Sequence, residues 1–263
     1  MSFNHISIIG AGVMGEALIA ALIKAGHSPA HIEIVEKRED RVRELVSRYG
    51  IKVSSNIYAS DVVLLVVKPQ DLTSVLAELN GKLPAQALVV SFVAGKRIES
   101  ISAGLGGSNP IVRVMPNTPT LVGEGAAGYS FGNGVSEHQK RFVSDLLDAS
   151  GIAVEVPEQL QDAVTATSGS GPAYFFAFVE AMIKGAKELG LSDQVATELT
   201  VQTIIGAARL LETSGKSPTT LRENVTSPNG TTFAALQSFS NDQLDQIVAR
   251  AMKAARDRSV ELS

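Results

Sequence analysis

The chain has 263 residues, of which 44% are hydrophobic, so it can bury the core of one large domain or of two smaller ones. Its formal net charge is -4, and its interspersed acids and bases build no positive field for nucleic acid. It has no cysteine, and its four histidines lack metal-ligand spacing, so we expect neither a disulfide nor a metal site. The first apolar run is far shorter than a membrane span, so we expect a cytoplasmic protein with no membrane partner.

Residues 6–156 alternate short β-branched apolar runs with helix-like segments, which is typical of a parallel sheet covered by helices on both faces. The predicted strands are residues 6–9, 32–35, 51–53, 62–67, 88–93, 111–115, 126–131 and 153–156. The predicted helices are residues 14–25, 40–49, 72–79, 98–103 and 137–149, and several end at a glycine. The fold class we expect is therefore α/β, with an N-terminal Rossmann-type doubly wound parallel sheet in residues 1–157.

After Pro157 the strand-like runs cease, and the sequence predicts long helices at residues 173–189, 194–212 and 241–262. We expect residues 158–263 to form an all-α C-terminal domain, joined to the sheet by a helix near residues 158–166. The helix around Phe175, Phe176 and Phe178 is apolar on all sides. This pattern indicates either burial against another subunit or a helix well buried within the monomer.

A glycine-rich turn follows the first predicted strand and opens the first helix. It is a full G-x-G-x-x-G motif, in which glycines permit the tight turn, the approach of a diphosphate and close helix–strand packing. Free amides at the helix N-terminus attract the anion. We expect the cofactor to contact Ile9, Gly10, Ala11, Gly12, Val13, Met14 and Gly15.

The end of the second predicted strand, where dinucleotide folds select the ribose, gives conflicting signals. Glu36 favours NADH, because a carboxylate there binds ribose hydroxyls and repels a 2′-phosphate. Lys37 and Arg38 favour NADPH, since two cations can hold that phosphate if Glu36 turns outward. A solvated charge cluster on a loop is the third interpretation. We expect NADPH as cofactor, with NADH possible.

Further loops end at the same edge of the predicted sheet, where ligands of open parallel sheets bind. We expect backbone contacts to the cofactor from Val67, Lys68 and Pro69 after the fourth strand and from Ala94 after the fifth. Asn56 is a candidate for the adenosine ribose, although it is equally suited to cap the short helix that follows.

The helical half contains no histidine, and its two polar loops, residues 165–172 and 225–232, are rich in hydroxyls and poor in acids and bases. Such loops suit a carboxylate and a substrate that is already protonated, such as an iminium, which hydride neutralises. Ser170 as a cap with Pro172 in the first turn also explains the first loop without any ligand. Thr231 and Thr232 follow the second loop at a predicted new helix N-terminus.

Across essentially its whole length the chain resembles the pyrroline-5-carboxylate reductases, which catalyse the last step of proline biosynthesis. The motifs that carry the resemblance are residues 10–15, 67–69, 113–119, 162–174 and 225–232. The resemblance implies a dimerisation role for the helical domain, with homodimers that in many members form rings of dimers. It also implies reduction of the cyclic imine 1-pyrroline-5-carboxylate to L-proline with NADPH or NADH.

Carried onto matching positions, the resemblance places the substrate carboxylate on the loop of Ser227, Gly230 and Thr231, with the catalytic Thr232 hydroxyl near the ring nitrogen. Asn229 stands where the family usually has a second glycine, and asparagine tolerates the left-handed backbone that such a turn needs. Arg113 has two interpretations: it lines the floor near the nicotinamide, or it is a structural arginine that ties a strand end to a loop.

Three other functions are weighed against this one. The β-hydroxyacid dehydrogenases have a lysine shortly after the start of the interdomain helix, whereas here Lys184 and Lys187 come several turns too late. A non-catalytic NADP-binding sensor would have no reason to keep the threonine-rich second loop. A reductase acting on a different cyclic imine also fits the loops.

Overall fold

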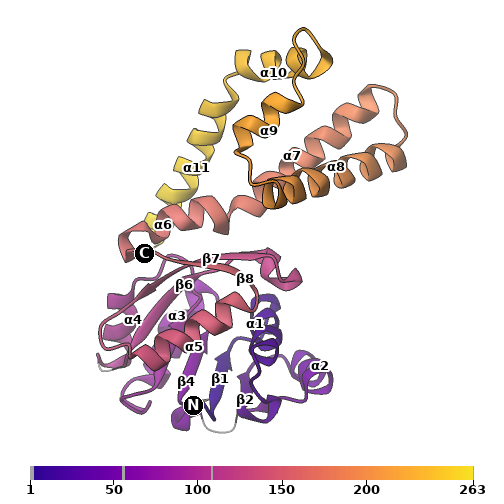
Figure 1. Cartoon of the computed structure of the whole chain (residues 1–263). Helices are drawn as coiled ribbons and strands as arrows, with labels where there is room; N and C mark the ends of the chain where they lie inside the picture. The colour runs from indigo at the N-terminus through magenta and orange to yellow at the C-terminus, as the bar shows by residue number, and fades with distance from the viewer. Residues whose placement is uncertain (1–2, 55–56, 108, 263) are drawn as a thin grey trace. The chain divides into compact units, whose positions relative to one another are not determined.

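The computed structural model describes residues 3–54, 57–107 and 109–262, which form two compact units (Figure 1). The first unit runs to Ser170 and also takes in the end of the chain from Ala255, and the second is Gly171–Ala254. Residues 158–170 thus lie with the sheet, while the predicted domain boundary before residue 158 stays a prediction.

The first unit is built on an eight-stranded sheet in the order β3-β2-β1-β4-β5-β6-β7-β8. The strands are Ile6–Ile9 (β1), Ile32–Val35 (β2), Lys52–Val53 (β3), Val62–Leu65 (β4), Leu88–Ser91 (β5), Ile111–Met115 (β6), Gly125–Phe131 (β7) and Gly151–Glu155 (β8). β1 pairs in parallel with both β2 and β4, so the strand order reverses beside β1. This reversal is the topological switch point at which open α/β sheets bind ligands.

The sheet departs from the expected all-parallel arrangement at one edge. β7 runs antiparallel to β6, and β8 pairs in parallel with β7, so these two strands oppose the other six. The connection from β6 to β7 contains only the short 3-10 turn Thr118–Val122 and Gly123 in the left-handed region (φ 79°). A parallel neighbour of β6 would need a long crossover connection, usually a helix, and this short connection has none. The chain therefore turns back, and β7 runs antiparallel to β6.

Helices cover both faces of the sheet, as the alternating pattern predicts (Figure 1). They are Val13–Lys24 (α1), Glu39–Tyr49 (α2), Leu72–Leu79 (α3), Ile98–Leu105 (α4) and Glu137–Asp148 (α5). One buried cluster joins Ile8, Ile34 and Leu64 to side chains of α1, α2 and α5. The other joins Ile9 and Leu65 to α3 and α4. Successive strand residues serve opposite faces, which explains why these strands are apolar throughout.

The connection out of the sheet is helical, as predicted. It consists of the 3-10 turn Glu158–Leu160, α6 (Gln161–Val164), the π-helical segment Thr165–Gly169 and then α7 (Gly171–Glu188). Ser170 has helical dihedral angles (φ -87°, ψ -16°), so the interpretation of Ser170 as a helix N-cap was wrong. A cap residue needs an extended backbone, whereas Ser170 has helical angles where it joins the π-helical segment to α7.

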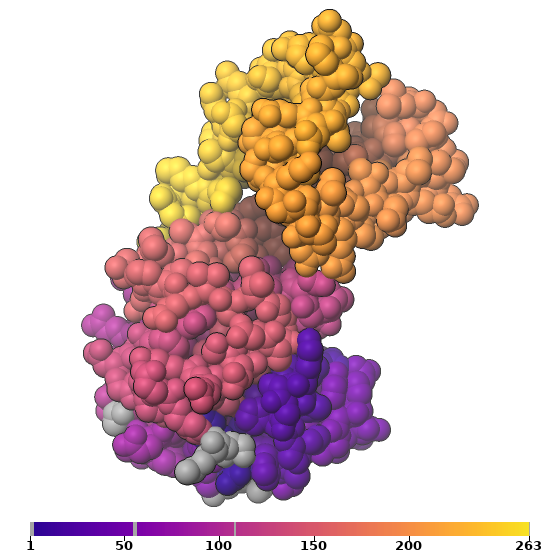
Figure 2. Space-filling model, in the orientation of Figure 1, coloured from indigo at the N-terminus to yellow at the C-terminus, as the bar shows by residue number. Residues whose placement is uncertain are grey.

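The second unit is entirely helical within residues 171–254. Its helices are α7, Asp193–Thr213 (α8), Pro218–Asn224 (α9), Thr231–Asn241 (α10) and the beginning of Leu244–Glu261 (α11). α7 and α8 pack side by side as a hairpin (Figure 1). In the space-filling view, α9 and α10 lie at the outer surface of this unit (Figure 2). No helix in the described ranges has an apolar stretch long enough to cross a membrane.

A buried ionic cluster secures the connecting helix to the sheet of the first unit. Arg113 on β6 is only 3% exposed. Its guanidinium nitrogens lie 3.5 Å from Glu158 Oε1 and 3.5 Å from Asp162 Oδ1. Ser259 Oγ donates to Asp162 Oδ1 at 2.7 Å, and the Ile98 amide donates to Glu158 Oε1 at 2.7 Å. These contacts favour the structural interpretation of Arg113.

We predict that Arg113→Met lowers the free energy of unfolding by about 3 kcal/mol, because it leaves a buried carboxylate without its cation. Urea titration measures this loss. The double variant Arg113→Met with Asp162→Asn should recover part of it, since the uncompensated charge is then removed. A variant as stable as the wild type would show that the cluster contributes nothing to folding.

Candidate functional site

The three glycines of the turn meet three different steric constraints. Gly10 has φ 92°, and a Cβ atom there would lie 2.7 Å from the carbonyl oxygen of Val66. A Cβ atom on Gly15 would collide with the carbonyl oxygen of Gly10. Gly12 differs, because nothing lies within 4 Å of its Cβ position. The fold therefore requires the first and third glycines, whereas the space above Gly12 is open to a ligand.

Two amides at this turn are free to bind an anion. The N–H groups of Gly12 and Val13 have no acceptor among the described residues. Two neighbouring amides are occupied: Gly10 donates to the Val35 carbonyl at 2.9 Å, and Ala11 donates to Glu36 Oε2 at 3.1 Å. If the predicted contact of Ala11 with the cofactor uses this amide, it has to replace the bond to Glu36.

The structure brings the loop after β4 against the glycine turn. The Val66 amide donates to the Ile9 carbonyl at 2.9 Å, and a Cγ atom of Val67 lies 3.2 Å from the Cβ position of Gly10. Lys68 has an extended backbone and precedes the 3-10 turn that begins at Pro69. Ala94 follows β5, the neighbour of β4 in the sheet. Asn56, the other predicted ribose contact, lies outside the described residues.

The residues at the end of β2 are arranged around the Glu36 carboxylate. Glu36 Oε1 accepts hydrogen bonds from the backbone amide of Arg38 at 3.1 Å and from Arg38 Nε at 3.2 Å. Partial burial raises the pKa of Glu36, but these bonds, the charge of Arg38 and the Ala11 amide hold it below its ordinary value. Glu36 thus turns inward to the glycine turn, so the outward position under which we expected Lys37 and Arg38 to hold a 2′-phosphate is not found. Lys37 is exposed and has no hydrogen-bond or ion-pair partner among the described residues.

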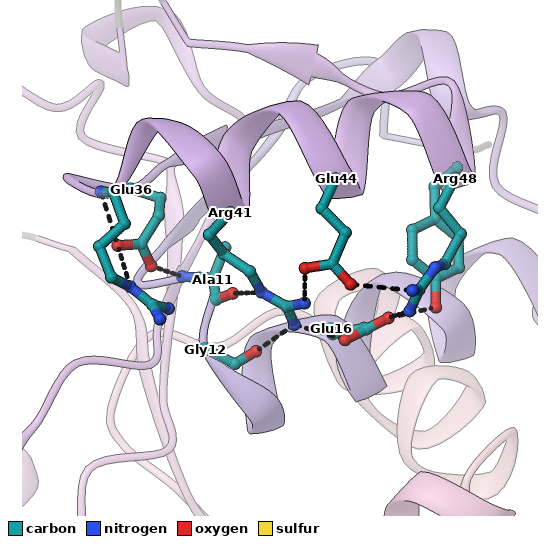
Figure 3. A network of polar contacts seen from close by, with 9 residues as sticks. Ala11, Gly12, Glu16, Glu36, Arg41, Glu44 and Arg48 are labelled. Carbon is teal, nitrogen blue, oxygen red and sulfur yellow. Dashed lines mark hydrogen bonds and ion pairs between the residues drawn. The ribbon is translucent and has the colours of Figure 1, made fainter.

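A second charge network beneath the turn escaped the sequence analysis (Figure 3). Arg41 on α2 donates from Nε to the Ala11 carbonyl at 3.1 Å and from Nη2 to the Gly12 carbonyl at 3.4 Å. It also forms ion pairs with Glu16 on α1 and with Glu44, the latter at 2.6 Å. Arg48 completes the network through ion pairs with the same two carboxylates.

This network had only a partial signal in the sequence. Glu16 lies in the first turn of α1, where an acid is ordinarily explained by the helix dipole. Glu44 and Arg48 have the i, i+4 spacing of a helix-surface pair, which is typical of solvent-exposed helices. Only the packing of α1 beside α2 brings these residues together beneath the turn.

In the second unit, the predicted substrate loop forms a tight turn. The Gly230 amide donates to the Ser227 carbonyl at 3.0 Å, with Pro228 and Asn229 between them. Asn229 has φ 56°, the left-handed conformation that the sequence predicted it would have to adopt. A Cβ atom on Gly230 would clash with Ser227 Oγ. Glycine at this position therefore lets the Ser227 hydroxyl approach the backbone.

Gly230 is also the N-cap of α10, and no side chain caps this helix. Its first amides, beginning with Thr231 and Thr232, are therefore not satisfied by a cap. The predicted helix N-terminus after the loop is confirmed. The structure thus brings together Ser227, Gly230, Thr231 and Thr232 as hydroxyls and amides around one helix start, without an acid or base among them.

The fold and the glycine turn define a Rossmann-type dinucleotide-binding protein. Comparison with known proteins supports this class: residues 5–95 match the family model described as NADP oxidoreductase coenzyme F420-dependent. Residues 158–262 match the model described as pyrroline-5-carboxylate reductase dimerisation.

Full-length relatives identify the family more closely. The pyrroline-5-carboxylate reductase of Corynebacterium melassecola is 44% identical, covering 98% of both chains, and that of Pseudomonas aeruginosa is 42% identical, covering 100% of this chain and 98% of the relative. The solved structure of a pyrroline-5-carboxylate reductase from Coxiella burnetii aligns with a TM-score of 0.90 at 34% identity, covering 100% of this chain and 99% of that one. The Plasmodium falciparum pyrroline carboxylate reductase with NADP bound gives 0.86 at 30% identity over 98% of both chains. The chain belongs to the pyrroline-5-carboxylate reductase family.

We predict opposite effects for two alanine substitutions in the glycine turn. Gly15→Ala should lower the free energy of unfolding by about 1–3 kcal/mol, because the new methyl overpacks the helix start. Gly12→Ala should cost less than about 1 kcal/mol of stability, the difference between glycine and alanine at an N-cap. It should instead weaken NADPH binding about tenfold, equal to about 1.4 kcal/mol. Urea unfolding measures the effect on stability, and cofactor fluorescence titration measures the effect on NADPH binding. Equal affinity of Gly12→Ala and the wild type for NADPH would contradict the assignment of the open space to the diphosphate.

A second prediction concerns the pH dependence of stability. Partial burial raises the pKa of Glu16, but hydrogen bonds from Arg41, Tyr49 and Arg48 and the charge of Arg41 bring it below its ordinary value of 4.5. The stability that its ionised form contributes is complete above pH 4.5 and is lost as the pH falls through the lowered value. The difference in unfolding free energy between wild type and Glu16→Gln should be constant from pH 6 to 8 and shrink in acid, as measured by urea titration. A difference that grows in acid would contradict this sign.

Proposed function

We propose that this protein reduces 1-pyrroline-5-carboxylate to L-proline by hydride transfer from NADPH. The observation that carries the proposal is the identity of 44% to a pyrroline-5-carboxylate reductase over 98% of both chains. A reductase for a different cyclic imine and a non-catalytic NADP-binding sensor are the alternatives that the experiments below separate from it.

We infer that the substrate carboxylate binds to the start of α10. The Ser227 hydroxyl and the Thr231 amide supply donors, and the positive end of the helix dipole adds to the attraction. The Gly230 amide joins them only if it releases the Ser227 carbonyl, to which it donates at 3.0 Å. The Thr232 hydroxyl then lies near the ring nitrogen and orients the imine. When bound, NADPH supplies the hydride.

The absence of acids and bases on this loop fits that chemistry. A protonated imine already carries its proton on nitrogen, and hydride transfer to the carbon neutralises the charge, so the nitrogen needs no proton donor at the moment of transfer. The task of the loop is to hold the substrate in a reactive orientation, and positioning of this kind lowers the barrier substantially.

We propose NADPH rather than NADH as the preferred cofactor. Glu36 is engaged by the Ala11 amide and by Arg38, so its charge is partly compensated within the protein. Arg38 remains 59% exposed, and Lys37 is exposed beside it. Two accessible cations at the ribose end favour a 2′-phosphate, and the partial neutralisation of Glu36 lowers the repulsion that a carboxylate would exert on it.

We further infer that the second unit is completed by a second copy of the chain. Within residues 171–254, only Gly171, Ala196 and Thr200 are buried. Phe175 and Phe176 are 62% and 63% exposed, which is costly for aromatic side chains on a free surface. A homodimer through these helices would bury them, in agreement with the dimerisation model that residues 158–262 match. Assembly into a ring of dimers and a cytoplasmic location stay predictions.

We predict that Thr232→Ala lowers kcat for 1-pyrroline-5-carboxylate about ten- to a hundredfold, corresponding to the loss of about 1.4–3 kcal/mol of orienting interaction. NADPH binding should be unchanged, because the cofactor turn is untouched. Steady-state oxidation of NADPH and fluorescence titration measure the two quantities. Thr219→Ala, an exposed threonine on α9, is the matched control and should behave as wild type.

The wild-type measurement decides between the functions. Turnover of this imine establishes the reductase. Binding of NADPH without turnover of 1-pyrroline-5-carboxylate would overturn the proposed substrate, and turnover of other cyclic imines would then separate a related reductase from a sensor.

The cofactor preference has its own test. Lys37→Ala and Arg38→Ala should each lower the ratio of kcat/KM for NADPH to that for NADH about tenfold, through loss of a charged hydrogen bond to the 2′-phosphate. Arg43→Ala, an exposed arginine elsewhere on α2, should leave the ratio unchanged. A wild-type preference for NADH, or an unchanged ratio in both variants, would contradict the proposal and indicate that Glu36 binds the hydroxyls of the adenosine ribose instead.

A further inference from the structure

The Arg41 guanidinium lies beneath the glycine turn with nearly all of its donors in use. A guanidinium has five N–H groups. Four are engaged by the contacts of Nε with the Ala11 carbonyl, of Nη2 with the Gly12 carbonyl and Glu16, and of Nη1 with Glu44. The side chain is only 12% exposed. Arg41 therefore has little capacity left to bind a ligand directly.

The charges around Arg41 balance one another. Two arginines, Arg41 and Arg48, face two glutamates, Glu16 and Glu44, and each cation contacts both carboxylates. Tyr49 adds a neutral hydroxyl that donates to Glu16 at 3.0 Å. The network thus brings no net positive charge beneath the turn. Any attraction for a diphosphate at this point must come from the backbone amides rather than from these arginines.

Peptide geometry links the two carbonyls that Arg41 holds to the two free amides. In a planar trans peptide, the C=O and N–H groups point in opposite directions. The Ala11 carbonyl shares its peptide with the Gly12 amide, and the Gly12 carbonyl shares its peptide with the Val13 amide. Arg41 approaches both oxygens from α2 (Figure 3), and the Gly12 oxygen also accepts from the Glu16 amide at 3.0 Å inside α1. Since the oxygens point toward Arg41, the N–H groups of the same peptides point away from it.

We propose that Arg41 is a positioning residue for the cofactor: by holding the carbonyls of Ala11 and Gly12, it orients the amides of Gly12 and Val13 toward the diphosphate. Glu16 and Glu44 in turn fix the plane of the guanidinium, so the turn is organised before the cofactor arrives. Preorganisation of this kind raises affinity, because less backbone freedom is lost on binding. The inference rests on the proposed binding of NADPH, but not on the identity of the imine.

Two substitutions at Arg41 test this role. Arg41→Lys keeps the charge and most of the stem, but an ammonium cannot span two carbonyls and two carboxylates in the geometry of the planar fork. Arg41→Gln removes the charge as well. Both should raise the Kd for NADPH, measured by fluorescence titration, about tenfold or more, the loss expected for hydrogen bonds from a charged donor. Arg43→Gln is the control, since Arg43 lies exposed on the same helix and contacts only Glu39 among the described residues.

A purely structural role would give a different kinetic pattern. At saturating NADPH, both Arg41 variants should keep the kcat and the KM for the imine within about twofold of the wild type, because only the cofactor turn has changed. If Arg41→Gln does not fold, as judged by circular dichroism, Arg41→Lys decides the question alone.

The outcomes are separable. Wild-type affinity in Arg41→Lys would overturn the inference, since a point charge would then suffice. A fall in kcat with a parallel rise in the KM for the imine would overturn it as well, because the defect would be general. A wild-type chain that binds no NADPH would overturn the proposed function itself, whereas binding without turnover of 1-pyrroline-5-carboxylate would leave the Arg41 test intact.

Discussion

The close approach of Gly10 to the backbone of Val66 is the constraint on which the cofactor half depends. At the point where the strand order reverses, the chain must leave β1 and start α1 beside the end of β4, and no Cβ atom fits between these segments. Gly15 repeats the constraint one turn later against Gly10 itself. The backbone is thereby bent so that the first amides of α1 face the open space above Gly12. The two glycines thus serve the fold, and the geometry that they permit serves the ligand.

Sterics alone do not fix the orientation of the peptides in this turn, and polar side chains from neighbouring elements complete the arrangement. Glu36, at the end of β2, accepts from the Ala11 amide, while Arg41 on α2 holds the next two carbonyls. The carboxylate thus binds the N–H of one peptide, and the guanidinium binds the C=O of the next two peptides along the chain. The same carboxylate also reaches the proposed ribose end, because Glu36 binds Arg38. In the proposed function, turn geometry and cofactor selection are therefore linked through one carboxylate.

Most of the sheet and its helices could be predicted, because strands and helices are marked by local signals: apolar runs, and glycines such as Gly50 at helix ends. The reversal of β7 and β8 could not be, since a strand's direction depends on the partner and on the connection rather than on its own residues. Nor could the sequence show that Ser170 is not a cap, since its helical backbone angles depend on the π-helical segment that precedes it. The glycine turn was visible in the sequence as a motif. The Arg41 network was not, because its members come from two helices that only the sheet brings together.

The central claim is that the turn after β1 holds the diphosphate of NADPH while the start of α10 holds the carboxylate of the substrate. A crystal structure of the protein with NADP⁺ and L-proline tests both halves at once. The account predicts diphosphate oxygens within hydrogen-bond distance of the Gly12 and Val13 amides, Arg41 still on the two carbonyls, and the proline carboxylate at Ser227, Gly230 and Thr231. A diphosphate bound directly by Arg41, or a carboxylate bound away from α10, would contradict it.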